Sequence, residues 1–197
     1  GGRILLPGLV DCHTHLVFGG SRIAEFARRM AGESYLDLAA EGGGIQSTVR
    51  ATRLMDEEEL YQSARKRALI MRSFGTTSVE VKSGYGLTLG DELRALRVGR
   101  RLASDGLLRS TTTLLGAHTV PEEYRSDREA YIRLVAEGMI PEAARLGLAD
   151  TCDAYIEREA FSVEEAERIF VAAKAHGLGI RGHVGQFSDL GGAELLA

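Results

Sequence analysis

Two histidines at alternate positions are the first residues of this sequence that could do chemistry. His13 and His15 stand in the run Asp-Cys-His-Thr-His. Side chains two positions apart on a β-strand point to the same face, so this spacing would present two imidazoles together. Such a pair forms half of a transition-metal site. The alternative is that one imidazole packs in the core while the other hydrogen-bonds locally.

The surroundings of this pair favour the metal interpretation. The apolar run from Leu9 to Val17 opens on Pro7-Gly8, which places the histidines late on a buried strand. In a barrel, the carboxyl end of a strand is where ligands are held.

Two of the three other histidines, His183 and His118, are candidates for the same end of the fold. His183 ends a predicted strand and is a candidate third ligand, since three protein ligands plus water form the usual catalytic zinc arrangement. His118 also ends a strand, where it could polarise a carbonyl or bind a carboxylate. His176 lies in the last turn of a predicted helix, whose partial negative charge favours it, and we assign it no catalytic role.

Other residues have weaker signals. Tyr85 lies in a glycine-rich loop that could aim it at a ligand. Arg22 could clamp a carboxylate, although most arginines are simply solvated. Gly42–Gly44 is typical of a hinge or turn, because it lacks the Lys-Ser/Thr of a phosphate-binding loop. Cys12 and Cys152 are predicted to be small buried hydrophobic residues rather than nucleophiles.

Short β-branched runs alternate with longer helical patterns along the chain. A capping box at Ser162 and Glu165 and a left-handed cap at Gly177 bound one helix, and Pro141 must kink or split another. The predicted strands are 9–17, 76–81, 110–115, 151–156 and 179–184, and the predicted helices are 56–72, 91–104, 127–145, 162–176 and 192 onward.

This alternation predicts an α/β fold with a parallel sheet and helical crossovers. Five units are too few for a closed eight-stranded barrel of about 250 residues. An open doubly wound sheet could be complete at 197 residues, so periodicity alone does not choose between the two.

Composition narrows the class of protein. The chain is 44% hydrophobic, which excludes a disordered chain, and its net charge of −4 argues against nucleic acid as a partner. No apolar run approaches the roughly 20 residues of a membrane helix, and no signal peptide is evident. Two cysteines are too few to stabilise a small secreted protein through disulfide bonds. We therefore expect a soluble cytoplasmic protein.

Several motifs together carry a resemblance. The run from Pro7 to His15 resembles the first-strand signature of the amidohydrolase superfamily, metal-dependent hydrolases on a (β/α)8 TIM barrel. Further segments are similar to the imidazolonepropionase family of that superfamily, and they occur in the expected order: 13–22, 34–37, 42–45, 80–87, 116–118 and 183–192.

The resemblance implies hydrolysis of 4-imidazolone-5-propanoate to N-formimidoyl-L-glutamate in histidine degradation, with one zinc or iron. Arg22 would bind the propionate, and either His118 or a His on strand six would stabilise the developing oxyanion. Gln186 would lie near the reactive water, where it can only hydrogen-bond. The implied metal ligands are His13, His15 and His183, and the implied substrate-binding residues are Arg22, Tyr35, Tyr85, His118 and Gln186.

The resemblance also implies what the sequence lacks. Two-metal relatives carry a bridging lysine on the fourth strand, whereas 151–156 has none, so we expect a single metal. The family places another His on strand six and an Asp on strand eight. Residues 1–197 would thus cover about the first five βα units of one barrel domain, incomplete at its C-terminal side. We expect this chain alone to be inactive, and the full-length protein to be a homodimer.

Two alternatives remain open. One is another cyclic amidohydrolase or deaminase, which would prefer a neutral base to an acid. The other is a non-catalytic chain that binds small acids.

Overall fold

The strands of this chain form one parallel sheet with helices between them. The computed structural model describes residues 2, 4–34 and 42–197. The sheet runs β1-β2-β3-β4-β5 in sequence order, and each described strand is parallel to the next. The strands are β1 (Leu9–Thr14), β2 (Thr76–Lys82), β3 (Arg109–Ala117), β4 (Thr151–Tyr155) and β5 (Gly179–His183).

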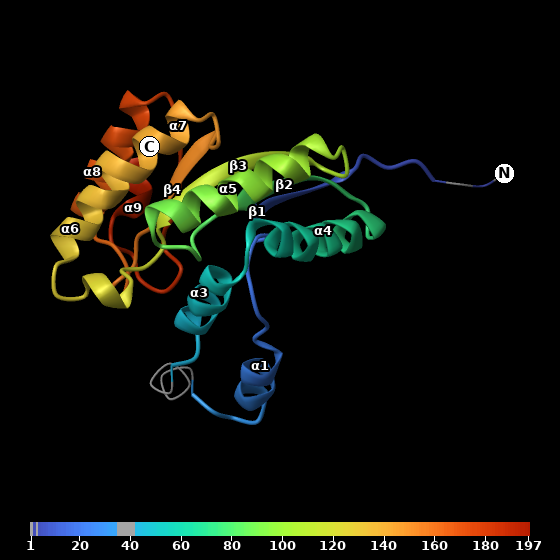
Figure 1. Cartoon of the computed structure of the whole chain (residues 1–197), viewed down its shortest axis with the longest axis horizontal. Coiled ribbons are helices and arrows are strands. Elements are labelled where there is room, and N and C mark those ends of the chain that lie inside the picture. The colour runs from blue at the N-terminus through green and yellow to red at the C-terminus, as the bar shows by residue number, and fades with distance from the viewer. Residues whose placement is uncertain (1, 3, 35–41) are drawn as a thin grey trace.

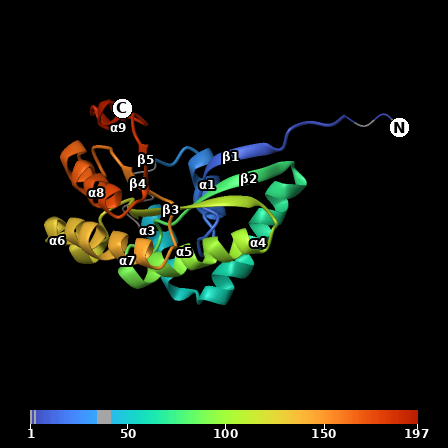
Figure 2. The ribbon, with the colours of Figure 1, turned by 90° about the horizontal axis from the view of Figure 1, so that it is seen from above.

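The helices between the strands gather mainly on one face of the sheet (Figure 2). They are α1 (Ile23–Met30), α3 (Ile45–Leu54), α4 (Glu57–Ser73), α5 (Leu89–Ser104), α6 (Arg128–Arg133), α7 (Ile140–Arg145), α8 (Val163–Ala175) and α9 (Gly192–Leu196), with a 3-10 turn at Glu122–Tyr124. Sequential parallel strands with helices on the outer face are the arrangement of a curled partial TIM barrel, which confirms the predicted α/β class.

The core lies between the sheet and these helices. One cluster joins β3 and β4 to the helices that follow them and includes Leu114, Tyr131 and Phe161, none of which is exposed to solvent. A second cluster joins α4 and α5 to β2. Leu16 and Val17 belong to it, because the chain leaves β1 after Thr14 and turns toward α4. The first strand is therefore shorter than the predicted 9–17.

Local signals place the ends of α4 and α8 within one residue of their predicted positions, whereas α1 and α3 were not predicted. The Ser162–Glu165 capping box is present at α8, and Gly177 after that helix has a φ of +77°. Helix α5 begins two residues earlier than predicted, at Leu89. Its N-cap is Thr88, whose hydroxyl accepts the Asp91 N–H at 3.1 Å.

The helix predicted over 127–145 is divided by a π-helical segment just before Pro141. A π-helical stretch, Leu134–Met139, separates α6 from α7. Proline has no N–H to donate, and its ring crowds the carbonyl four residues back. The wider π turn accommodates both the missing N–H and the crowded carbonyl, so the chain stays helical through Pro141.

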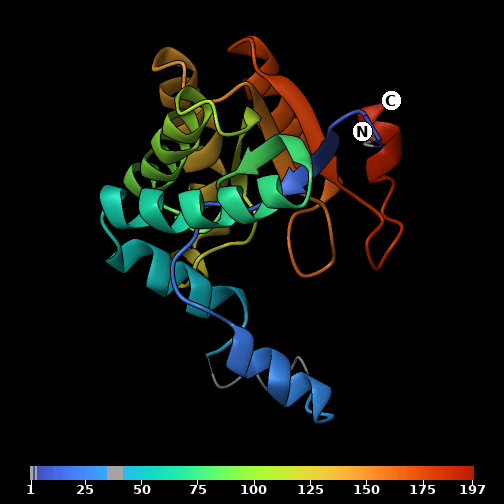
Figure 3. The same cartoon turned by 90° about the vertical axis from the view of Figure 1, so that its right-hand side faces the viewer.

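Helix α1 extends away from the sheet (Figures 1 and 3). It buries none of its residues, and Ile23 and Phe26 on it are largely exposed. No helix in the described residues is both long and apolar enough to cross a bilayer.

Candidate active site

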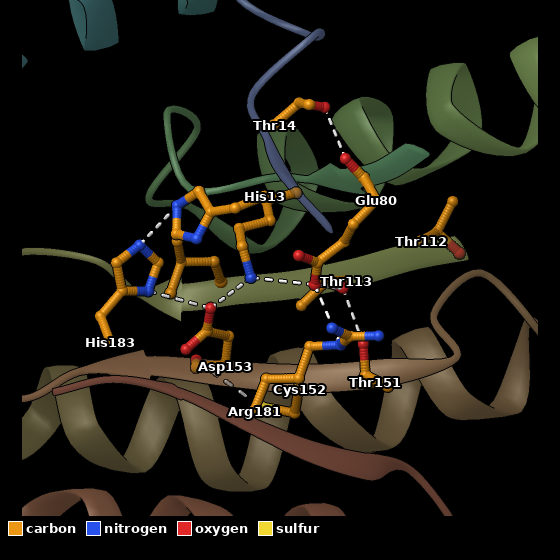
Figure 4. Close-up of polar contacts among 12 residues, drawn as sticks. His13, Thr14, Glu80, Thr112, Thr113, Thr151, Cys152, Asp153, Arg181 and His183 are labelled. Atoms are coloured by element: carbon orange, nitrogen blue, oxygen red, sulfur yellow. Dashed lines mark hydrogen bonds and ion pairs between the residues drawn. The ribbon is translucent and has the colours of Figure 1, made fainter. Parts of the chain in front are cut away.

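Three histidines from the two edges of the sheet meet at its carboxyl end. His13 is near the end of β1, His15 follows it, and His183 is the last residue of β5. Each offers a ring nitrogen, and these atoms all lie within 4.8 Å of one another. The Nε2 atoms of His13 and His183 are 2.8 Å apart (Figure 4). A flat sheet would separate β1 from β5 by about 19 Å, so curvature of the sheet brings them together.

Neighbouring oxygens orient two of these rings. The Nδ1 atom of His15 lies 3.0 Å from the carbonyl oxygen of Ser83. A carbonyl can only accept, so this nitrogen carries the hydrogen and Nε2 keeps its lone pair. The Nδ1 atom of His183 lies 3.0 Å from Oδ2 of Asp153, which leaves its Nε2 facing the cluster. Histidines that ligate metals usually make such contacts through the other ring nitrogen.

The cluster is suited to a cation. Burial, followed by the nearby His183, lowers the pKa of His13, and burial lowers the pKa of His15 well below its ordinary value. Both rings are therefore neutral at pH 7, with lone pairs available. Three imidazole donors match the protein ligands of a catalytic transition-metal site, so these residues fit the metal that the sequence predicts.

A buried group of charges lies behind His183 (Figure 4). Nζ of Lys82 contacts carboxylate oxygens of both Glu80 and Asp153, and all three side chains are almost fully buried. Burial acts to raise the pKa of Asp153, but His183 and Lys82 hold it below its ordinary value. Arg181 approaches Glu80 from β5 at 3.1 Å.

These charged residues had no predicted role. Glu80 and Lys82 are two residues apart on a strand, and that spacing by itself indicates a shared face. Nothing local indicates that Asp153, 71 residues further on, completes the group.

His118 and Tyr85 lie against His15. The His118 ring stacks on His15 with centroids 5.0 Å apart, and Tyr85 is 4.9 Å from His15. Nδ1 of His118 donates to the Gly84 carbonyl at 2.8 Å. Burial is the main cause that lowers the pKa of His118 to about 4, so the ring is neutral at pH 7. Its Nε2 is then a hydrogen-bond acceptor, and the oxyanion role implied by the resemblance stays a prediction.

Arg22 lines a separate hollow beside this aromatic group. Its Nε donates to Glu25 at 3.0 Å. Phe18, Phe26 and Arg67 line the same hollow. The Arg67 guanidinium lies over the Phe18 ring at 3.5 Å, a second cation here that sequence reasoning missed.

The remaining predicted residues have different outcomes. Gln186 is exposed in the loop after β5, and Tyr35 lies outside the described residues. Cys152 is buried as predicted, but the prediction for Cys12 was wrong. Cys12 is exposed because β1 is an edge strand and its concave side lines an open hollow with Glu80.

The loop carrying Gln186 is held to the segment after β4 by one carboxylate. Glu157 accepts the N–H groups of Phe187 and Ser188 at 3.0 and 3.1 Å and that of Arg158 at 3.0 Å. These bonds, that of Arg158 above all, lower the pKa of Glu157 to about 2. Sequence reasoning did not identify this residue.

We expect Glu157 to make the fold sensitive to acid. Its folded-state pKa lies below the ordinary 4.5, so its contribution is complete above about pH 4.5 and is lost as the pH falls toward 2. The urea concentration at the midpoint of unfolding should fall less between pH 6 and pH 2.5 in Glu157→Gln than in the parent, because the variant has no carboxylate to protonate. Glu159→Gln, exposed in the same loop, is the control and should keep the parent's profile. An unchanged profile in Glu157→Gln would contradict the assignment.

Comparisons with known proteins agree with the motifs. No protein-family model matches the chain. Curated proteins named imidazolonepropionase match it over its whole length: 54% identical over 196 residues in Chromobacterium violaceum, 49% in Aeromonas hydrophila and 50% in Salmonella paratyphi A. The chain spans about half the length of these relatives, 48% in each case. Over the segment that it spans, the chain therefore belongs to the imidazolonepropionase family.

Proposed function

We propose that this chain supplies part of the active site for metal-dependent hydrolysis of 4-imidazolone-5-propanoate to N-formimidoyl-L-glutamate, a step of histidine degradation. The observation that carries the proposal is the convergence of His13, His15 and His183 in a chain about half identical to proteins of that name. Residues 1–197 would be about five of the eight βα units of one barrel domain.

His13, His15 and His183 would hold one divalent zinc or iron ion. When bound, such an ion lowers the pKa of water and polarises a carbonyl. His13 and His15 are neutral before an ion binds, so their lone pairs are available. The Nδ1 atoms of His15 and His183 face the oxygens of Ser83 and Asp153, which directs the Nε2 atoms toward the ion. The ligand set is thereby oriented before the cation arrives.

Arg22 would bind the propionate. Glu25 takes its Nε–H, and the terminal nitrogens can then pair with a carboxylate in the forked geometry that guanidinium favours. The hollow adjoins the histidine site through a row of rings. Phe18 lines the hollow, its ring centroid is 6.2 Å from that of Tyr85, and the Tyr85 centroid is 4.9 Å from that of His15. This proximity supports an acid whose carboxylate pairs with Arg22 and whose ring extends toward the histidines.

His118 and its neighbours would position the ring. The neutral His118 can accept a ring N–H of the imidazolone through Nε2, and Tyr85 forms an aromatic wall beside it. Gln186, on the loop tied down by Glu157, could hydrogen-bond to water or substrate but could not act as a base. Tyr35 remains a predicted pocket residue.

The test is a substrate comparison with the natural full-length protein loaded with zinc or iron. Turnover of imidazolone propanoate well above that of hydantoin and guanine would support the proposal. Preference for a neutral base would favour the alternative of another cyclic amidohydrolase or deaminase. Metal and acid binding without turnover of any of them would favour a non-catalytic protein.

Arg22→Ala tests the carboxylate site. Hydrogen bonds to charged groups contribute about 1.5–3 kcal/mol, so we expect KM for the acid to rise roughly 10- to 100-fold. An imidazolone with a methyl group in place of the propionate should be turned over equally by variant and parent. Arg29→Ala, an exposed arginine of the same helix, is the matched control. Equal losses for the acid and the methyl analogue would place Arg22 outside the substrate site.

A further inference from the structure

The loop between β2 and α5 touches two of the active-site imidazoles with consecutive carbonyl groups. The Ser83 carbonyl accepts from Nδ1 of His15 at 3.0 Å, and the Gly84 carbonyl accepts from Nδ1 of His118 at 2.8 Å. Each bond places the ring hydrogen on Nδ1 and leaves Nε2 with a lone pair. Two adjacent peptide groups therefore set both the tautomer and the direction of these rings.

The backbone of this loop adopts conformations that need support. Gly84 has a φ of +105°, and a Cβ there would stand 2.9 Å from Nδ1 of His118. Leu87 has a φ of +56°, which residues with side chains seldom adopt. Such conformations persist only where the surrounding structure holds them.

The side chain that holds the loop is Glu92. It is fully buried in the first turn of α5, where burial raises its pKa while the helix dipole and the hydrogen bonds from the loop favour the carboxylate. Its Oε1 accepts the N–H groups of Gly86 and Leu87, both at 2.8 Å, and its Oε2 accepts that of Gly84 at 3.0 Å. Three N–H groups of the loop thus converge on one carboxylate.

Peptide planarity passes this restraint to His15. The Gly84 N–H and the Ser83 carbonyl belong to one planar peptide unit. Holding that N–H toward Glu92 therefore directs the Ser83 oxygen to the opposite side, where it meets Nδ1 of His15. Leu87 and Gly86, held by the same carboxylate, fix the far end of the loop, so the Gly84 carbonyl stays toward His118.

We propose that Glu92 is a positioning residue of the active site, which orients His15 and His118 through the peptide groups of residues 83–87 without touching either ring. The inference rests on the proposed function only in giving the two imidazoles their roles. The restraint itself concerns ring orientation, which can be measured without substrate.

The experiment uses the natural full-length protein with 15N-labelled histidine and long-range 1H–15N spectra in the absence of metal. In the parent, His15 and His118 should show a protonated Nδ1 and an unprotonated Nε2. In Glu92→Ala both signals should move toward mixed tautomers. Zinc affinity, measured against a competing chelator, should fall about 10- to 100-fold, as it does when an outer partner of a ligand is lost.

Conservative and remote substitutions separate positioning from general stability. Glu92→Gln keeps the Oε1 acceptor, which receives the N–H groups of Gly86 and Leu87 and also, at 3.2 Å, that of Gly84. It should therefore retain the parent's tautomer at His15 and lose less than about tenfold in zinc affinity. This variant also decides the case if Glu92→Ala does not fold. Glu165→Gln is the control, because Glu165 likewise accepts a backbone N–H in the first turn of a helix, that of Ser162 in α8.

The outcomes are distinct. Histidine signals and zinc affinity unchanged in a folded Glu92→Ala variant would overturn the proposal, whatever its stability. The proposal would also be overturned if Glu92→Gln and Glu165→Gln both lost the parent's tautomer signals at His15 and His118. Equal losses in the two variants would show a global effect on the fold. A parent that fails to hydrolyse imidazolone propanoate but shows the expected tautomer changes would refute the proposed function and leave the positioning role intact.

Discussion

Replacing both His13 and His15 by alanine is expected to remove the bound metal from the full-length protein and abolish hydrolysis. Loss of an outer partner alone costs about 10- to 100-fold in metal affinity, so loss of two of three imidazoles should cost more than about 100-fold. The direct readout is the metal content per protein chain after dialysis, measured by inductively coupled plasma mass spectrometry. It does not depend on knowing the substrate.

The control is His176→Ala, because His176 is exposed at the end of α8 and ligates nothing in the proposed site. It should keep the parent's metal content. A double variant that retains one metal per chain would mean that His13 and His15 are not ligands.

The second large effect is expected from Lys82→Met. Methionine is similar in length but carries no charge, so the substitution leaves the buried carboxylates of Glu80 and Asp153 without their shared cation. Breaking a buried ion pair by removing one partner costs about 3–5 kcal/mol of unfolding free energy. Arg181 still faces Glu80 and His183 still faces Asp153, so we expect the lower end of that range.

Urea unfolding of the full-length protein measures this change, with Lys174→Met on the exposed side of α8 as the matched control. A loss below about 1 kcal/mol would show that the carboxylates gain water or protons at little cost. The triple variant Lys82→Met/Glu80→Gln/Asp153→Asn should recover part of the loss, because it removes the unpaired charges themselves.

Features that depend on near neighbours in the chain could be predicted. The Ser162–Glu165 capping box, the left-handed Gly177 and the strand predicted over 76–81, observed over 76–82, follow from interactions within a few residues. The early start of α5 at Leu89 and the π turn before Pro141 were missed. Both depend on which of several local hydrogen-bonding solutions the packed helices prefer.

The candidate site divides in the same way. The pairing of His13 with His15 follows from strand periodicity, and the position of His183 at a strand end follows from its flanking residues. The meeting of His13 with His183, 170 residues away, requires a curled sheet. Cys12 shows the same limit, since its exposure depends on β1 lying at the edge.

Residue types at the carboxyl ends of the strands, and the motifs that indicate the family, can be read from the amino-acid sequence. The orientation of those residues depends on tertiary contacts. Asp153 behind His183, and Glu92 beneath the loop that meets His15, act through contacts across strands or through backbone N–H groups whose direction depends on the loop. Residue type and spacing along a chain encode which groups are available, whereas orientation arises when distant segments exclude water and satisfy one another's hydrogen bonds.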